Sequence, residues 1–288
     1  MPDNTVIDRK LYSSNITPEQ WAIVAPLFPI HTGRGRKQRI PLQEIISAIF
    51  YINTNGCKWV DLPHDFPPAT SVSYHYCKWT NSGLWRRIND ALREAVREQA
   101  GRDPHPSAGA LDSQTTKAAP TGGPRGYDGG KRTTGRKKHI LVDTLGLLIV
   151  VVVTAASVAD ADGARGVLAR ISRFDQPRLS TIFVDQAYHR AELYEFADEH
   201  LSCTLQVGNR PAGSVGFVPI WKRWVMERTF GWLVHHRRHA RDYERTYDSS
   251  EAHVYISHIQ ILLKRLTKTR GPEHSAPASN AAFPSIAA

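Results

Sequence analysis

Residues 138–155, KHILVDTLGLLIVVVVTA, contain two apolar runs separated by a turn. The first run covers residues 138–142, the second covers residues 147–155, and Asp143-Thr-Leu-Gly146 lies between them. Short apolar runs that are rich in β-branched residues and flank a glycine-containing turn are typical of two strands joined in a hairpin. The sequence therefore predicts an antiparallel hairpin in the middle of the chain.

The segments on both sides of this hairpin alternate between strand and helix patterns. One short strand precedes it and ends at Leu111-Asp112. The residues that follow predict a helix over 163–174, a strand over 180–184, a helix over 190–200, a strand over 203–207, a long helix over 219–241 and a final helix over 249–266. This order favours a sheet with one antiparallel hairpin and parallel crossover connections. The predicted fold class is α/β.

The first hundred residues are predicted to be helical. Thr17-Pro18-Glu19-Gln20 combines an N-cap, a proline at the first helical position and a capping-box glutamine. Later helices are expected to begin at Pro41, near Thr70 and at Ser82. The turn-rich connector Asp61-Leu-Pro-His-Asp-Phe-Pro-Pro68 separates the second of these four helices from the third.

Two helices around a short connector suit a helix-turn-helix, in which the second helix enters the major groove of DNA. The candidate DNA contacts on that helix are Ser71, Ser73, Tyr74, His75 and Lys78. A plain helical bundle that does not contact DNA fits the same pattern, so both interpretations stay open.

Composition divides the chain into four segments. Residues 1–100 are predicted to form a helical DNA-binding domain, and residues 101–108, which contain glycine and proline, a linker. Residues 109–268 are predicted to form a catalytic domain. Residues 269–288 are rich in alanine, proline and serine and are predicted to be disordered.

The chain is strongly basic, with a formal net charge of +10 at pH 7 and a pI of about 9.6. Its basic residues gather in three stretches, 34–39, 125–138 and 221–245. Such clustering favours a phosphate backbone as partner, although solvated loops and helix faces give the same composition. The candidate contacts outside the N-terminal helices are Lys117, Lys131, Arg136, Lys137, Lys138, Arg223 and Arg238.

Several classes of protein are not expected. No apolar run approaches the roughly 18 residues of a membrane span, and the N-terminal residues lack the apolar core of a signal peptide. The cysteines, Cys57, Cys77 and Cys203, form no CxxC pair, so neither a zinc site nor a disulfide framework is expected. We expect a cytoplasmic, nucleoid-associated protein that does not contact membranes.

Two aspartates, Asp112 and Asp185, directly follow apolar strand patterns and are predicted at strand C-terminal ends. If their strands are neighbours, about 4.8 Å apart, both carboxylates can reach one metal ion. Oxygen ligands suit Mg²⁺, which keeps waters and substrate phosphate in its other positions. A strand-end aspartate is also common as a turn former or helix cap. Three other aspartates are weaker candidates for metal ligands. Asp143 lies in a turn, and Asp160 and Asp162 lie at the start of a helix.

Glu227 adds a third carboxylate, within an aromatic-rich helical segment. On a regular helix Arg223, Gly231, Val234 and Arg238 lie within about 40° of it. A carboxylate flanked by arginines, beside a glycine that permits close approach, suits a metal ligand next to a phosphodiester. An Arg–Glu pair on a solvated helix is the simpler alternative.

Six motifs carry a resemblance to a known family. They are Asp112-Ser-Gln-Thr-Thr-Lys117, Tyr127-Asp-Gly-Gly-Lys131, Gly135-Arg-Lys-Lys-His139, Leu141-Val-Asp-Thr-Leu-Gly146, Asp185-Gln-Ala-Tyr188 and Arg223-Trp-Val-Met-Glu-Arg-Thr-Phe-Gly-Trp-Leu233. Together they resemble the DDE transposases of bacterial insertion sequences, in the insertion-sequence-five branch. The similarity extends to residues 15–95, which resemble the N-terminal helical domain of that group.

This resemblance implies a ribonuclease H-like catalytic domain after a helical, helix-turn-helix-like domain. The catalytic and metal-binding residues would be Asp112, Asp185 and Glu227, holding two Mg²⁺ or Mn²⁺ ions. The implied activity is binding of an element's terminal inverted repeats, metal-dependent cleavage of double-stranded DNA and strand transfer into target DNA by a homodimer. A structure-specific nuclease of the same fold, or an inactive copy that acts as a DNA-binding repressor, are the alternatives.

The sequence departs from the family signature on the helix of the sixth motif. Arg223 and Glu227 match, but Ile220 stands where the family has a tyrosine and Val234 where it has a lysine. Phosphate contacts expected from those two positions must come from elsewhere. Arg238, placed by helical periodicity on the same face as Glu227, is the candidate replacement.

Overall fold

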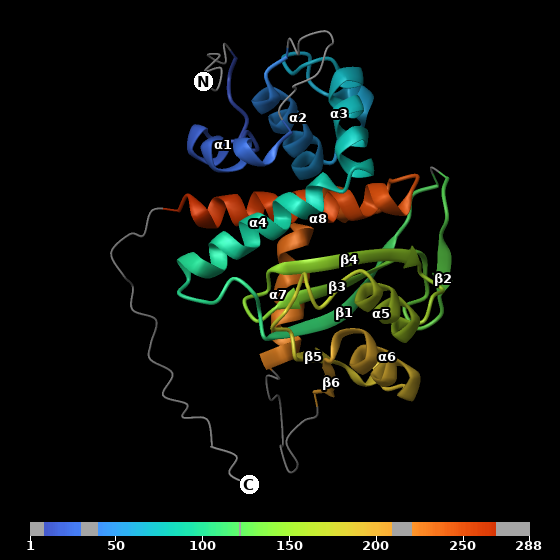
Figure 1. The fold of residues 1–288 in the computed structure, drawn as a ribbon. Coiled ribbons are helices and arrows are strands. Elements are labelled where there is room, and N and C mark those ends of the chain that lie inside the picture. The colour runs from blue at the N-terminus through green and yellow to red at the C-terminus, as the bar shows by residue number, and fades with distance from the viewer. Residues whose placement is uncertain (1–8, 30–39, 121, 209–220, 269–288) are drawn as a thin grey trace.

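The computed structural model describes residues 9–29, 40–120, 122–208 and 221–268, with the side chains of residues 221–223 outside this description. A six-stranded sheet forms its centre, with helices on both faces (Figure 1). The strands are β1 (Ala108–Lys117), β2 (Gly126–Asp128), β3 (Thr133–Asp143), β4 (Leu148–Ala155), β5 (Thr181–Val184) and β6 (Thr204–Val207). The predicted α/β class is confirmed.

The sheet combines antiparallel and parallel pairing. β3 pairs with β1, β2 and β4 in antiparallel fashion, whereas β1 pairs with β5 and β5 with β6 in parallel. The predicted hairpin is the β3–β4 pair. Its turn is held by Asp143, whose Oδ1 accepts hydrogen bonds from the backbone N–H of Leu145 at 2.9 Å and of Leu147 at 2.8 Å.

Helices bury both faces of the sheet. One face packs against α5 (Asp160–Ala169) and α6 (Ala191–Leu201), and we call it the α5 face. The other packs against α7 (Trp221–Val234) and α8 (Tyr247–Leu266), and we call it the α7 face. The alternation of side chains along β3 explains this division, because Leu141 faces α5 while Ile140 and Val142 face α7.

The N-terminal region is helical, as predicted. It contains α1 (Pro18–Val24), α2 (Leu42–Asn55), α3 (Ala69–Asn81) and α4 (Leu84–Gln99). The capping box at the start of α1 is present, with Thr17 and Gln20 bonding each other's backbone. Gly56 ends α2 with φ of +72°, a left-handed conformation that glycine adopts without strain. Gly83, with φ of +66°, precedes α4 where Ser82 was expected as the cap.

The helical region and the sheet share one hydrophobic core. α8 lies between them (Figure 1) and packs against α1 to α4 on one side and β4 on the other. Buried polar contacts tie the parts together. Asn53 on α2 donates to Ser257 Oγ at 2.8 Å and Gln260 Oε1 at 3.1 Å, both on α8. The full chain is therefore the proper unit for experiments, and the functional division at residues 101–108 stays a prediction.

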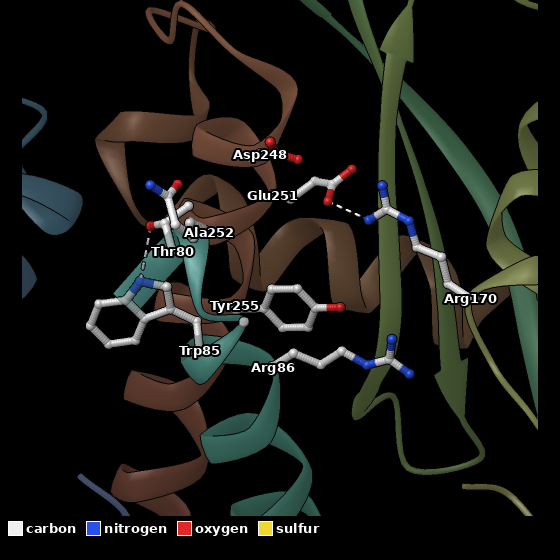
Figure 2. Close-up of a pocket in the computed structure, with 10 residues that line it drawn as sticks. Thr80, Trp85, Arg86, Arg170, Asp248, Glu251, Ala252 and Tyr255 are labelled. Carbon is white, nitrogen blue, oxygen red and sulfur yellow. Dashed lines mark hydrogen bonds and ion pairs between the residues drawn. The ribbon is translucent and has the colours of Figure 1, made fainter. Parts of the chain in front are cut away.

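The outer edge of β4 is covered by side chains rather than by another strand. The backbone N–H of Val153 donates to Glu251 Oε1 at 2.8 Å, and Asn89 Nδ2 donates to the carbonyl of Leu148 at 2.9 Å. A polar pocket of about 480 Å³ lies beside this edge, between the starts of α4 and α8. Figure 2 shows Arg170 bonded to Glu251 within it. Its lining includes none of the predicted site residues.

Three element boundaries differ from expectation and matter for the site. β1 continues past Asp112 to Lys117, because its polar half pairs with β3. α7 ends at Val234 instead of near residue 241, and α5 begins at Asp160. No helix in the described ranges is long and apolar enough to cross a membrane.

Candidate active site

Asp112 and Asp185 lie on neighbouring strands. In the parallel pair of β1 and β5, Ala110 stands opposite Phe183. Asp112 and Asp185 each lie two residues beyond this last pair. The condition that the two strands are neighbours is met, and Asp185 directly follows β5 as expected. Asp112 lies within β1 rather than at its end, which corrects the sequence prediction.

The electrostatics of this pair favour a bound cation. Burial, together with the negative charges of Asp185 and Asp160, raises the pKa of Asp112 to about 6. The backbone N–H of Ser113 opposes this by donating to Asp112 Oδ1 at 2.7 Å. Asp185 Oδ1 accepts from the N–H of Ala187 at 2.9 Å. Two close carboxylates repel each other until a cation or proton is shared between them.

Glu227 belongs to the helix that covers the same face of the sheet. Asp112 stands directly opposite Ile140 on β3, which packs on the α7 face, so the Asp112 side chain is on that face as well. Glu227 is exposed on α7, as are Gly231 and Val234 on the same side of that helix. A methyl group added at Gly231 would meet no atom within 4 Å, so the surface beside Glu227 is open.

The carboxylates of Asp112 and Asp185 offer ligands that suit a divalent cation. Asp112 and Asp185 supply oxygen ligands, and one or two carboxylates with waters and substrate phosphate are a usual Mg²⁺ environment. Within the described residues, no group of three or more His, Cys, Asp or Glu side chains is arranged to hold a metal ion. The aspartate pair therefore fits one cation, whereas the three-carboxylate site with Glu227 stays a prediction.

Comparison with known proteins gives two family matches. A family model described as a transposase of the IS4/5 family matches residues 16–89, and one described as a transposase DDE domain matches residues 103–213. The chain belongs to the DDE transposases of the IS4/5 type. The second match includes Asp112 and Asp185 and ends before Glu227. No curated protein and no solved structure matches the chain.

Three basic residues of this transposase that were predicted to contact DNA are buried instead. Arg136, Lys137 and Lys138 lie in β3, which has strands on both sides and helices on both faces. Arg136 is 3.1 Å from Asp242, and Lys138 is 3.1 Å from His239 Nδ1. The prediction is wrong for these residues because a central strand sends alternate side chains into the two cores.

Arg238 is also misplaced by the sequence prediction. α7 ends at Val234, so helical periodicity does not carry over to Arg238 in η4 (Arg237–His239). Its buried guanidinium pairs with Glu244 and donates to the carbonyl of Cys57 at 2.9 Å. Arg238 is thus a structural residue and does not replace the missing lysine. The side chain of Arg223 lies outside the described part of the transposase.

The remaining DNA-contact candidates are accessible. Lys117, at the end of β1, and Lys131, between β2 and β3, are exposed. On α3, Tyr74 is 63% exposed and Lys78 is exposed, whereas Ser73 is half-buried and donates to the carbonyl of Thr70. These positions are compatible with DNA contacts, which stay a prediction.

The sequence analysis missed a polar cluster on the α5 face behind Asp112. It consists of Ser113, Lys137, Asp160 and Tyr188. The sequence predicts Asp160 only as a weak candidate for a metal ligand, and it gives Tyr188 only as the last residue of a motif. The available signal was the alternation along β1, which places Ser113 and Asp112 on opposite faces of the sheet. Asp143, by contrast, is a buried turn residue paired with Arg97.

Proposed function

We propose that this transposase binds the terminal inverted repeats of an insertion sequence and catalyses metal-dependent DNA cleavage and strand transfer. The observation that carries the proposal is that Asp112 and Asp185 each lie two residues beyond the last residue pair of two adjacent parallel strands in a DDE domain. Glu227 is proposed as the third carboxylate, because it projects from the helix that covers the same face.

The chemistry needs little covalent work from the protein. A Mg²⁺ or Mn²⁺ pair held by the three carboxylates would activate water and stabilise the charges of an in-line displacement at phosphorus. Hydrolysis of a phosphodiester at the element's end frees a 3′-hydroxyl. That hydroxyl then attacks a phosphodiester of the target DNA, with no covalent intermediate on the protein.

The chain's own part is orientation and charge. Asp112, with its pKa raised by burial to about 6, is mostly ionised at neutral pH, and the Ser113 N–H fixes one of its oxygens. Asp185 is fixed in the same way by the N–H of Ala187. Side chains oriented before the substrate arrives lower the cost of reaching the transition state.

DNA is proposed to contact two surfaces. The exposed side of α3, with Tyr74 and Lys78, is placed to read the inverted repeats. Lys117 and Lys131, both exposed, are proposed to bind backbone phosphates. We propose a homodimer that bridges two element ends on the nucleoid, in the cytoplasm.

A cleavage assay with the full chain tests this proposal. Double-stranded DNA that carries the element's end would be incubated with Mg²⁺, with a scrambled end as the comparison, and resolved on a denaturing gel. We expect nicking at the end followed by joined products. Nicking without joining would favour a structure-specific nuclease, and end-specific binding without nicking would favour a repressor.

Carboxylate substitutions then test the residues. Asp112→Asn, Asp185→Asn and Glu227→Gln keep the side-chain shape but remove a charge that hard cations require. Each is expected to abolish cleavage and to leave end binding nearly unchanged. Asp198→Asn, at an exposed acid on α6, is the matched control and should cleave normally. Substantial cleavage by any one of the three variants removes that residue from the centre.

A further inference from the structure

The pairing of β1 with β5 stops before it reaches the two aspartates. Its last paired residues are Ala110 and Phe183, whereas Asp112 and Asp185 lie two residues further along their chains. No main-chain hydrogen bond of that ladder sets the spacing of the two carboxylates. The backbone of Asp112 is still held by its pairing with Ile140 on β3, so side chains near the point where β1 and β5 part can adjust the separation of the two carboxylates.

Ser113, the residue after Asp112, is anchored on the α5 face. Its backbone N–H donates to Asp112 Oδ1 at 2.7 Å, and its hydroxyl donates to Asp160 Oδ1 at 2.7 Å. Lys137 Nζ lies 3.0 Å from the same Asp160 oxygen and also donates to the carbonyl of Val158 at 2.9 Å. The positive charge of Lys137 balances the negative charge of Asp160. This chain of hydrogen bonds therefore holds Ser113 without adding net negative charge behind Asp112.

Tyr188 approaches the same point from the other strand. It lies three residues after Asp185, at the end of η3 (Gln186–Tyr188), and only 1% of its surface is exposed. Its ring packs in the core of the α5 face. Its hydroxyl has no hydrogen-bond partner within the described part of the chain. Buried hydroxyls are nearly always bonded, so an orphaned one needs an explanation.

The surroundings of that hydroxyl indicate its acceptor. Burial raises the pKa of Tyr188, the negative charge of Asp112 is the next largest cause, and an interaction of the Tyr188 hydroxyl with the side chain of Ser113 opposes the shift. The Ser113 oxygen already donates its hydrogen to Asp160 but keeps lone pairs free to accept one. The Tyr188 and Ser113 hydroxyls therefore lie beside each other where the strands part, and a hydrogen bond between them would join the two strand continuations.

We propose that Tyr188 is a positioning residue that, with the chain Ser113–Asp160–Lys137, sets the spacing and orientation of Asp112 and Asp185 for a divalent cation. The proposal rests on the proposed function of the two aspartates as metal ligands. Groups behind metal ligands commonly act in this way, because they fix the direction of the ligand oxygens. Mg²⁺ needs such precision, since it demands near-octahedral geometry at about 2.0–2.1 Å.

The test measures Mn²⁺ binding directly, by electron paramagnetic resonance on the full chain without DNA. Tyr188→Phe removes only the hydroxyl, and Tyr194→Phe on α6 is the matched control. Tyr188→Phe is expected to weaken Mn²⁺ binding by about tenfold, as for other groups behind metal ligands, and Tyr194→Phe to leave it unchanged. Ser113→Ala, which removes the bridge from the other strand, should weaken it similarly.

Thermal unfolding separates positioning from a structural role. Among the described residues no hydrogen bond of normal geometry reaches the Tyr188 hydroxyl, so Tyr188→Phe should leave the Tm measured without added metal unchanged or slightly raised. The rise in Tm on adding Mn²⁺ should become smaller. A fall in the metal-free Tm with an unchanged Mn²⁺ affinity would make Tyr188 a packing residue and overturn the proposal.

The Asp112→Asn variant separates this inference from the proposed function. If Asp112→Asn loses Mn²⁺ binding while both Tyr188→Phe and Ser113→Ala bind like wild type, the metal centre stands and the positioning role is overturned. If Asp112→Asn also binds like wild type, the metal centre itself is overturned, and the positioning role with it.

Discussion

Arg238 and Glu244 form a buried ion pair between α7 and α8, with Arg238 Nη2 2.6 Å from Glu244 Oε1. The same guanidinium donates to the carbonyl of Cys57, just after α2, and Glu244 also accepts from Ser249 at the start of α8. Two segments far apart in the sequence, at residue 57 and at residues 238–249, thus meet at one pair. The charge of each residue lowers the cost of burying the other.

Arg238→Ala is expected to destabilise the fold. It would leave Glu244 without a charged partner in a buried site, with only Ser249 and the neutral His253 beside it, which costs about 3–5 kcal/mol. Arg237→Ala is the matched control, because Arg237 is the adjacent residue with the same charge and is exposed. Urea unfolding at neutral pH measures the difference. Equal free energies of unfolding for the two variants would show that the pair contributes nothing to stability.

The position of Arg238 shows what the sequence could not reveal. Residues 234–241 contain no glycine or proline that would mark a helix end, so the helix was predicted to continue. The chain leaves α7 after Val234 because residues beyond it form tertiary hydrogen bonds. His239 bonds to Ser257 on α8, and Arg238 bonds to Glu244 and to the carbonyl of Cys57. Tertiary contacts of this kind override local helix preference.

The two aspartates differ in how far the sequence could place them. Asp185 follows four strand-forming residues, so its position directly after β5 was predictable. Asp112 is followed by Ser-Gln-Thr-Thr-Lys, which has no apolar alternation, although this half of β1 pairs with β3 as far as Lys117. The burial of Arg136 to Lys138 escaped prediction for a related reason. Their partners, Asp160, His239 and Asp242, are distant in the sequence.

Two glycines of α5 should respond in opposite ways to alanine. A Cβ at Gly163 would lie 2.0 Å from the His139 ring, so Gly163→Ala should destabilise the fold by roughly 1–3 kcal/mol through overpacking. A Cβ at Gly166 would meet only Val152 Cγ1, at an ordinary 3.6 Å. Gly166→Ala should stabilise by about 0.5–1 kcal/mol, because alanine favours a helix interior.

Thermal and urea unfolding of the two α5 variants would measure these effects side by side. A stabilised Gly163→Ala protein would mean that the His139 ring moves aside at little cost. In that case close contact with β3 would not be the reason for a glycine at this position.

The buried histidines of α8 predict a loss of stability in mild acid. Burial lowers the pKa of His253 to about 4 and of His258 to about 3. Their unfolded pKa is about 6.5, so between pH 6.5 and about 4 the unfolded chain binds protons that the folded chain does not. Stability is therefore full above pH 6.5 and falls as the pH is lowered through this window, by on the order of 1 kcal/mol per pH unit for each histidine.

His258→Leu tests the histidine effect, because both ring nitrogens of His258 are buried without hydrogen-bond partners within the described residues. The variant should show a shallower decline of Tm between pH 7 and pH 5 than the wild type. His64→Leu, on the connector before α3, is the control and should leave the slope unchanged. Parallel curves for the wild type and His258→Leu would assign the acid sensitivity to other groups.

The exposed side of α3 should carry the recognition of element ends. Tyr74 and Lys78 lie four residues apart on this helix, and neither packs in the core, whereas Val72, Tyr76 and Trp79 face inward. Tyr74→Ala is therefore expected to weaken binding to the element's end by about 1–3 kcal/mol, the usual cost of losing a base contact, without lowering Tm. Scrambled DNA should be affected much less.

Lys78→Ala should behave differently, because a lysine on a groove-binding helix contacts phosphates more often than it reads bases. It should weaken binding to the element's end and to scrambled DNA alike, and reduce the dependence of log K on log salt by about one. Arg102→Ala, at an exposed cation beyond α4, is the control for net charge. Fluorescence anisotropy titrations at three salt concentrations measure all of these quantities. If Lys78→Ala and Arg102→Ala change the affinity and the salt slope equally, and Tyr74→Ala changes neither, α3 contributes only to the overall charge, and the inverted repeats must be recognised by another surface.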